Sequence, residues 1–162
     1  MSSQLIDPAS VVIERRVQWP DTDAAGHQHH SVVMRWVEEA ELALLDGLGL
    51  AHLFGRTPRV NYQADYRARL WLGQRVVITL AVAQIGTSSL TYHFDVGSGE
   101  TSVASGEVSI VHTGTNATGA QPWPAKIRAA LSDSGVQRRN DGEKSDIPTG
   151  ADQHTIPAQD RG

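Results

Sequence analysis

The chain has 162 residues, a formal net charge of −4 and no cysteine. A single domain is the expectation at this length. The absence of cysteine excludes disulfides, thiolate metal sites and a cysteine nucleophile. The acidic balance argues against nucleic-acid binding, which needs a basic face. No apolar run approaches the roughly 18 residues of a membrane span, and the first ten residues lack the basic and apolar regions of a signal peptide. We therefore expect a cytoplasmic protein with no membrane partner.

The composition changes abruptly at Ser132. The 31 residues from 132 to 162 contain five apolar side chains and no aromatic residue. Such a segment cannot bury enough apolar surface to offset the entropy lost when it is ordered. We therefore predict one folded domain over residues 1–131 and a disordered tail over residues 132–162.

The first half of the domain is predicted to hold one strand and one long helix. Residues 11–19 alternate loosely between apolar and polar side chains, which indicates a half-buried strand. Over residues 31–46 the apolar positions recur at the spacing of one helix face, and Gly47 is a natural stop. The residues expected to face the core are Val11, Ile13, Val17 and Trp19 in the strand, and Val32, Val33, Trp36, Val37, Ala40, Ala43 and Leu44 in the helix.

Four further strands follow the helix. Residues 60–67 and 90–96 alternate with the period of a half-buried strand, residues 74–85 are apolar on both faces, and residues 102–112 are a weaker candidate. Short turns between these segments favour antiparallel pairing. A helix with one apolar face needs a sheet to cover, so we predict an α+β fold in which a curved, antiparallel, five-stranded sheet wraps around one long central helix. A short final helix is expected over residues 125–131.

The segment between the first strand and the helix carries the chemistry. It reads DTDAAGHQHH from Asp21 to His30, with two carboxylates, one glycine and three imidazoles. A helix start offers unpaired N–H groups and the positive end of the helix dipole, which can hold a developing oxyanion. A carboxylate fixed beside it can act as a nucleophile or as a general base on water. The segment therefore suits the hydrolysis of an activated acyl group.

The run DTDAAGH, followed by a helix containing RWVEEAE, resembles the hotdog-fold acyl-CoA thioesterases of the 4-hydroxybenzoyl-CoA thioesterase type. The resemblance covers roughly residues 11–113 and includes the pattern TPRVNYQADYRARLWLGQRVVI. It implies a hotdog sheet around the long helix. It also implies a homodimer or homotetramer in which the sheets of paired subunits join and the active sites lie at the subunit interface.

The resemblance also implies roles for individual residues. Asp23 would be the catalytic carboxylate, Asp21 would stabilise the loop, and backbone N–H groups near the helix start would polarise the thioester carbonyl. His30 aligns with an aromatic or amide group near the thioester, so it is a second catalytic candidate. The candidate substrate contacts are Gly26, His27, His29, Arg59 and Asn61, although residues in the position of the last two are more often solvated edge residues than ligands.

The sequence departs from this family at two places. Gln28, His29 and His30 stand where relatives often carry Val-Tyr-Tyr or Val-Asn-Asn, and residues 84–89 lack the basic side chains that some relatives place there for the CoA phosphates. A different set of basic residues would then have to recognise CoA or an acidic carrier protein. The candidates are Arg56, Arg59, Arg67, Arg69, Arg75, Lys126 and Arg128.

We predict a thioester hydrolase that cleaves acyl-CoA or acyl-carrier-protein thioesters without a metal or a cofactor. Two other functions stay open, namely a hotdog dehydratase or hydratase, because of the His-rich loop, and a non-catalytic module that binds acyl thioesters. Glu38 or Glu39 on the helix is the alternative catalytic carboxylate. The spacing of Glu39 from Arg35, however, favours an ordinary ion pair within the helix.

Overall fold

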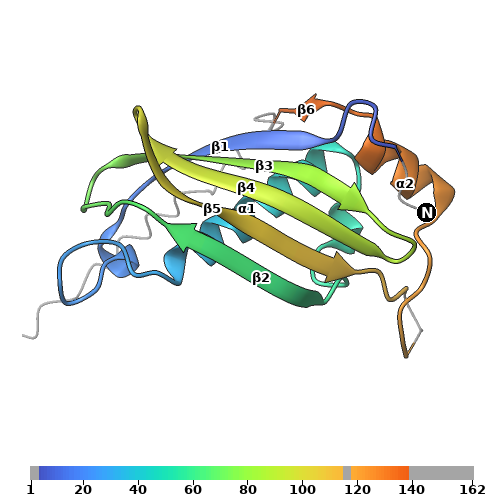
Figure 1. Cartoon of the computed structure of the whole chain (residues 1–162), viewed down its shortest axis with the longest axis horizontal. Coiled ribbons are helices and arrows are strands. Elements are labelled where there is room, and N and C mark those ends of the chain that lie inside the picture. The colour runs from blue at the N-terminus through green and yellow to red at the C-terminus, as the bar shows by residue number, and fades with distance from the viewer. Residues whose placement is uncertain (1–3, 115–117, 139–162) are drawn as a thin grey trace, which may run out of the picture.

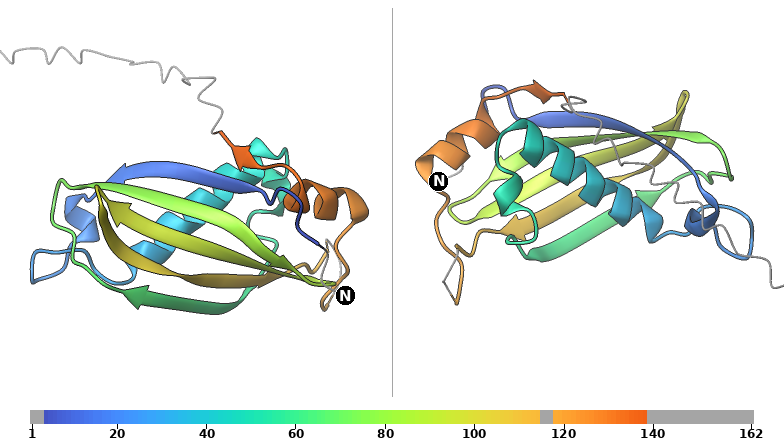
Figure 2. Two further views of the ribbon diagram at one scale, coloured as in Figure 1. Left: turned by 45° about the horizontal axis from the view of Figure 1, so that its top comes forward. Right: turned by 180° about the vertical axis from the view of Figure 1, so that it is seen from behind.

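The computed structural model describes residues 4–114 and 118–138, which form a six-stranded sheet crossed on one face by a 16-residue helix (Figures 1 and 2). No helix among these residues has the length and apolar character needed to cross a membrane. In chain order the elements are β1 (Ser10–Arg16), the 3-10 helix η1 (Trp19–Asp21), α1 (Val32–Gly47), the 3-10 helix η2 (Ala51–Leu53), β2 (Arg59–Tyr66), β3 (Arg75–Ile85), β4 (Ser89–Ser98), β5 (Thr101–Val111), α2 (Ala125–Ser132) and β6 (Val136–Gln137).

The strands lie in the order β2-β5-β4-β3-β1-β6, so β2 forms one edge of the sheet. The pairs β1–β3, β3–β4, β4–β5 and β2–β5 are antiparallel, as predicted from the short turns. The predicted count of five strands is wrong, because β6 pairs in parallel with the beginning of β1. Gly135, with a φ of +59°, turns the chain back after α2 and accepts a hydrogen bond from the Ser10 N–H at 3.0 Å.

The predicted boundary between domain and tail therefore falls too early. Residues 132–138, which the composition assigned to the tail, complete α2 and form β6. Val136 is exposed, so backbone hydrogen bonds and not burial of apolar side chains order this segment. The remainder of the predicted tail, residues 139–162, lies outside the described residues.

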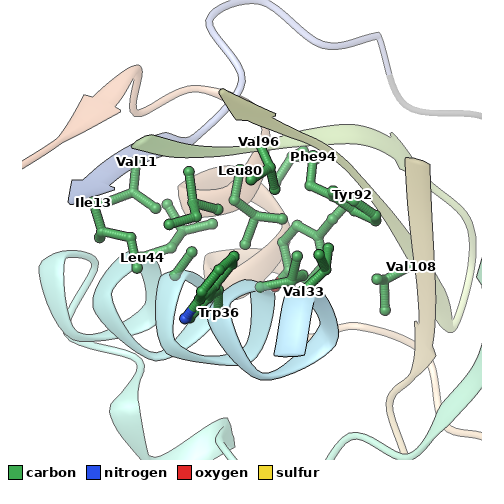
Figure 3. Close-up of a cluster of buried hydrophobic side chains, with 14 of the residues drawn as sticks. Val11, Ile13, Val33, Trp36, Leu44, Leu80, Tyr92, Phe94, Val96 and Val108 are labelled. Carbon is green, nitrogen blue, oxygen red and sulfur yellow. The ribbon is translucent and has the colours of Figure 1, made fainter. Parts of the chain in front are cut away.

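The core lies between α1 and the face of the sheet that it crosses (Figure 3). The alternation predicted for β1 and β4 is confirmed, and the apolar face predicted for α1 is buried except for the half-buried Ala43. Trp19 is 77% exposed, contrary to prediction, because the chain leaves the sheet after Val17 and winds into η1. The helix continues through Gly47, and the left-handed residue that ends it is Gly49, with a φ of +70°.

The edge strand β2 is less buried than its alternation predicts. Tyr62 and Ala64 are half-buried, but Val60 is 62% exposed and Tyr66 is also exposed. The register against β5 shifts between Arg59 and Asn61, which breaks the alternation at the beginning of the strand. One edge of β2 pairs with β5, and no described strand pairs with its other edge.

A buried ion pair lies within the apolar face of α1. Glu41 is 2% exposed and forms a short hydrogen-bonded ion pair with Arg59 at the beginning of β2. Burial raises the pKa of the Glu41 carboxyl, and the Arg59 charge partly opposes this rise. The pair therefore joins the helix to the edge strand. The negative charge of Glu41 is costly to bury, and Arg59 compensates it.

Replacing Arg59 by Met should leave the Glu41 carboxyl buried without its cation. We expect a loss of about 3 kcal/mol in the free energy of unfolding near neutral pH. Without Arg59, the pKa of Glu41 is higher still in the folded protein than in the unfolded chain. The folded state then binds more protons, so the added instability should grow as the pH rises from the ordinary glutamate pKa through the raised one. Urea unfolding at several pH values measures both effects.

The double variant Glu41→Leu/Arg59→Met removes both charges and is the matched control. It should recover most of the lost stability and remove the added pH dependence, because no uncompensated charge remains. An Arg59→Met variant as stable as the wild type at neutral pH would show that the ion pair does not support the fold.

Candidate active site

The loop between η1 and α1 lies at the end of the molecule opposite α2 (Figure 1). Asp21 fixes this loop, because one carboxylate oxygen accepts the Gln18 N–H at 2.8 Å and the other accepts the Arg35 guanidinium at 2.7 Å. The Asp21 carbonyl also accepts the His29 N–H at 2.7 Å. Asp21 is buried and connects both ends of the loop to α1, as the resemblance implied for this residue.

A tight turn orients Asp23. The Asp23 N–H donates to the His27 carbonyl at 3.0 Å, and the Gly26 N–H donates back to the Asp23 carbonyl at 3.0 Å. Gly26 has a φ of +84°, a conformation that glycine adopts without strain. One Asp23 carboxylate oxygen accepts the Ala25 N–H at 2.8 Å, and the other lies 4.0 Å from His27 Nδ1. The second oxygen accepts no hydrogen bond within the described residues.

Asp23 lies in a cavity of about 330 Å³. The predicted site residues His27 and His30 line the same cavity. Gly26 and His29 belong to the same loop but do not line the cavity. The other side of the cavity comes from the last residue of β2 and the segment that follows it, which were not predicted to face the loop. The lining residues are Asp23, His27, Gln28, His30, Tyr66, Arg67, Ala68 and Arg69.

The beginning of α1 has no side-chain cap. Ser31 occupies the capping position, but its hydroxyl hydrogen-bonds to His29 Nδ1 at 2.8 Å. The His30 carbonyl accepts the Tyr66 hydroxyl at 2.7 Å, and the His30 N–H has no acceptor among the described residues. The ring of His30 lies against that of His29, with centroids 4.2 Å apart. A free backbone donor therefore lies beside the cavity that holds Asp23.

Gln28 joins the two walls of the cavity. It is 6% exposed, and its N–H donates to the Leu70 carbonyl at 2.8 Å. Its side-chain amide donates to the Ala68 carbonyl at 3.3 Å and accepts the Leu70 N–H. The sequence marked Gln28 only as a departure from relatives, because nothing local shows that a polar residue between histidines becomes buried.

Two predicted substrate contacts lie elsewhere. Arg59 is held in the ion pair with Glu41, and Asn61 is exposed on the edge strand. Neither lines the Asp23 cavity of a single chain. Their role in substrate binding stays a prediction.

The helix glutamates Glu38 and Glu39 lie close to arginines outside the Asp23 cavity. Glu39 pairs with Arg15 of β1, and Arg35 pairs with Asp21, so the expected ion pair between Glu39 and Arg35 is wrong. Glu38 lies 3.6 Å from Arg59. Neither glutamate lines the Asp23 cavity. In the described part of the chain, no group of three His, Cys, Asp or Glu side chains is placed to hold a metal ion.

Comparison with known proteins agrees with this geometry. Residues 17–131 match the model of the thioesterase-like superfamily. The chain belongs to this superfamily. The hotdog thioesterase resemblance is thereby confirmed, and the protein is a thioester hydrolase.

Individual relatives support the same family. A 1,4-dihydroxy-2-naphthoyl-CoA hydrolase from Synechococcus sp. (strain CC9605) is 32% identical over 137 residues, which cover 78% of this chain and 86% of the relative. A solved 1,4-dihydroxy-2-naphthoyl-CoA thioesterase from Synechocystis has a TM-score of 0.69 at 20% identity, covering 76% of this chain and 96% of that chain. A gentisyl-coenzyme A thioesterase has a TM-score of 0.67 at 24% identity, with 75% and 99% covered. The two structures show that the thioesterase shares their fold.

Replacing Gln28 by Ala should separate the walls of the Asp23 cavity. The change leaves the Leu70 N–H and the Ala68 carbonyl without their side-chain partners, so we expect a loss of about 2 kcal/mol in the free energy of unfolding. Thioester hydrolysis should fall more than stability alone explains, because Tyr66 and the residues after it are no longer held against the loop. Urea unfolding and steady-state kinetics measure the two effects.

Gln74→Ala is the matched control. The Gln74 side chain also accepts a backbone N–H, that of Trp71 at 2.7 Å, but in an exposed turn. Water can replace that hydrogen bond, so Gln74→Ala should cost well under 1 kcal/mol and leave hydrolysis unchanged. Equal effects of the two substitutions would contradict a special role for Gln28.

Proposed function

We propose that this thioesterase hydrolyses aromatic acyl-CoA thioesters, with Asp23 as the catalytic carboxylate and the His30 N–H as an oxyanion donor. The observation that carries the proposal is the pairing of a turn-fixed carboxylate with an unpaired backbone donor at one cavity. A donor that is already oriented stabilises negative charge on the thioester oxygen without a cost of reorganisation. Relatives named for hydroxylated aromatic acyl-CoA substrates favour an aromatic acyl group.

Asp23 can promote hydrolysis by either of two balanced routes. In the first, its carboxylate attacks the carbonyl carbon, the C–S bond breaks, CoA leaves as the thiolate, and water hydrolyses the resulting mixed anhydride. In the second, Asp23 takes a proton from water, the hydroxide attacks the carbonyl carbon, and the thiolate leaves and is protonated. In both routes the carbonyl oxygen becomes negative while it lies against the beginning of α1.

His30 can assist from the same side of the cavity. Its backbone is fixed through the Tyr66 hydroxyl, and its ring is held by contact with His29. The imidazole can donate a hydrogen bond to the thioester carbonyl or border the acyl group. This histidine replaces the aromatic or amide residue expected at the position, so we assign it to the shape and polarity of the acyl pocket.

Asp23→Asn keeps the size of the side chain and its hydrogen bond to Ala25 but removes the reactive charge. We expect kcat for an aroyl-CoA to fall at least about 1000-fold, while secondary structure and oligomeric state stay unchanged. Thiol release measured with a chromogenic disulfide reports the rate. Single-turnover hydrolysis in ¹⁸O-labelled water then separates the routes, because only the anhydride route leaves the label in Asp23.

Full activity of Asp23→Asn would overturn the assignment of Asp23. Asp46→Asn, near the end of α1, is the control and should hydrolyse thioesters at the wild-type rate. An enoyl-CoA hydrated by the wild type without any thioester cleavage would instead favour the hydratase alternative. Thioester binding without turnover across a panel of aromatic and aliphatic acyl groups would favour a binding module.

We further propose that two copies of the chain pair along the unpaired edge of β2. That edge contains neither Lys nor Pro, the residues that commonly prevent edge-to-edge pairing, and it exposes Val60 and Tyr66. Tyr66 also lines the Asp23 cavity, so this interface would border the site. The arrangement agrees with the joined sheets implied by the resemblance to hotdog thioesterases.

Val60→Lys should place a charge on this edge and convert the dimer into a monomer. Size-exclusion chromatography with light scattering should then give a mass near the 17.5 kDa of one chain. Val12→Lys is the control, because Val12 is similarly exposed but lies on β1, which has neighbours on both sides. A Val60→Lys variant that elutes as the wild-type oligomer would exclude this edge as the interface.

A further inference from the structure

Some arginine side chains in the described part of the chain form ion pairs or hydrogen bonds with other residues, and others form no ion pair. Of the six arginines considered as CoA anchors, Arg59, Arg75 and Arg128 already bind carboxylates or backbone carbonyls. Arg56, Arg67 and Arg69 form no ion pair within the described residues, and the Arg67 side chain donates to the Ser105 hydroxyl at 2.7 Å. Arg56 lines other cavities, whereas Arg67 and Arg69 line the cavity of Asp23. The committed arginines are Arg15, Arg16, Arg35, Arg59, Arg75 and Arg128.

Arg67 and Arg69 also occupy a defined place beside the catalytic carboxylate. Both line the Asp23 cavity and both are exposed, so their charged groups lie at its solvent-facing rim. The Arg67 N–H donates to the Val103 carbonyl at 2.8 Å, and the intervening Ala68 is held by Gln28. The backbone that carries both arginines is therefore fixed relative to Asp23.

We propose that Arg67 and Arg69 bind the phosphate groups of the CoA moiety, an inference that rests on the proposed function. Arginine presents a planar fork of N–H donors that matches phosphate oxygens, and charge-assisted hydrogen bonds are the stronger kind. Two guanidinium groups without carboxylate partners can form such bonds at no cost of breaking an existing ion pair. The location replaces the turn after β3, which some relatives use and which carries no basic residue here.

The length of the substrate agrees with this placement. The pantetheine arm separates the thioester sulfur from the nearest phosphate by about 15 Å when extended, taking the rise per bond of an extended chain. With the thioester at Asp23, the phosphates therefore lie outside the cavity and not on its floor. The Arg67 guanidinium is held by the Ser105 hydroxyl of β5 at the exposed side of the cavity. The arginines at the rim thus face the end of the substrate that carries its negative charge.

The test compares one acyl group on two carriers. Benzoyl-CoA has the phosphates, whereas the benzoyl thioester of N-acetylcysteamine keeps the reacting group and lacks them. For Arg67→Gln/Arg69→Gln we expect KM for benzoyl-CoA to rise about 100-fold, taking about tenfold for each lost charged contact, with kcat nearly unchanged. The kcat/KM for the N-acetylcysteamine thioester should stay within about twofold of the wild type, because it makes no phosphate contact.

Arg138→Ala is the control, since Arg138 is an exposed cation whose backbone lies near Gly47, at the end of α1 that is away from Asp23. It should leave KM for both substrates unchanged. Equal losses on the two substrates by the arginine variant would overturn the proposal and indicate a structural role. No loss on benzoyl-CoA, or a loss seen only with a benzoyl carrier protein, would overturn it as well.

A binding measurement separates this proposal from the proposed function. Calorimetric titration of the wild type with CoA and with pantetheine requires no turnover. The arginine variant should lose affinity for CoA and not for pantetheine, and the wild-type affinity for CoA should fall as salt is added. If the wild type hydrolyses no thioester but shows this pattern, the proposed function fails and the phosphate site stands. If affinity for CoA is equal in the two proteins, the phosphate site fails whatever the activity.

Discussion

The hydrogen bonds of one buried amide, Gln28, hold the candidate site together. Asp23 and His30 come from the loop before α1, whereas Tyr66 ends β2 and Arg69 lies in the segment that follows it. Gln28 connects these segments through both its backbone and its side chain, to residues about 40 positions away. Three bonds to backbone groups fix a geometry that two exposed loops would not keep, because such loops gain little from packing.

In the same loop, some residues stabilise the fold and others keep polar groups without partners. The usual stabilising contact at a helix start is a side-chain cap, and here Ser31 bonds to His29 instead of capping α1. Asp21 holds the loop through Arg35, so the first turn of the helix does not need that cap. Within the described residues the His30 N–H has no acceptor and one Asp23 oxygen accepts no hydrogen bond, which fits the acyl-transfer site that we propose. Of the two acidic residues of DTDAAGH, Asp21 holds the loop, and Asp23 is the one that we propose for the chemistry.

The parts of the molecule that could be predicted are those that local sequence determines. The buried helix face with Val33 and Trp36 and the alternation along β4 follow from the periodicity of apolar residues. This periodicity can be read without knowing which elements pack together. Gln28, Glu41 and β6 could not be predicted, because each depends on a partner distant in sequence. A polar residue inside an apolar pattern looks like an exception until its partner is known. The motif located the loop, but only the fold shows which residues after β2 face it.

The net charge of −4 for the whole chain does not describe the charge around the Asp23 cavity. Several acidic side chains form ion pairs with Arg15, Arg35, Arg59 and Arg75. The net charge of the chain is therefore negative, but not every part of its surface is. At the Asp23 cavity the balance reverses, since Arg67 and Arg69 outnumber the single carboxylate among the lining residues. An overall acidic protein can therefore attract a polyanionic substrate, because at physiological ionic strength a charge acts over only about 8 Å. What matters for CoA is the charge near the cavity, and among the residues that line it the arginines outnumber the carboxylate.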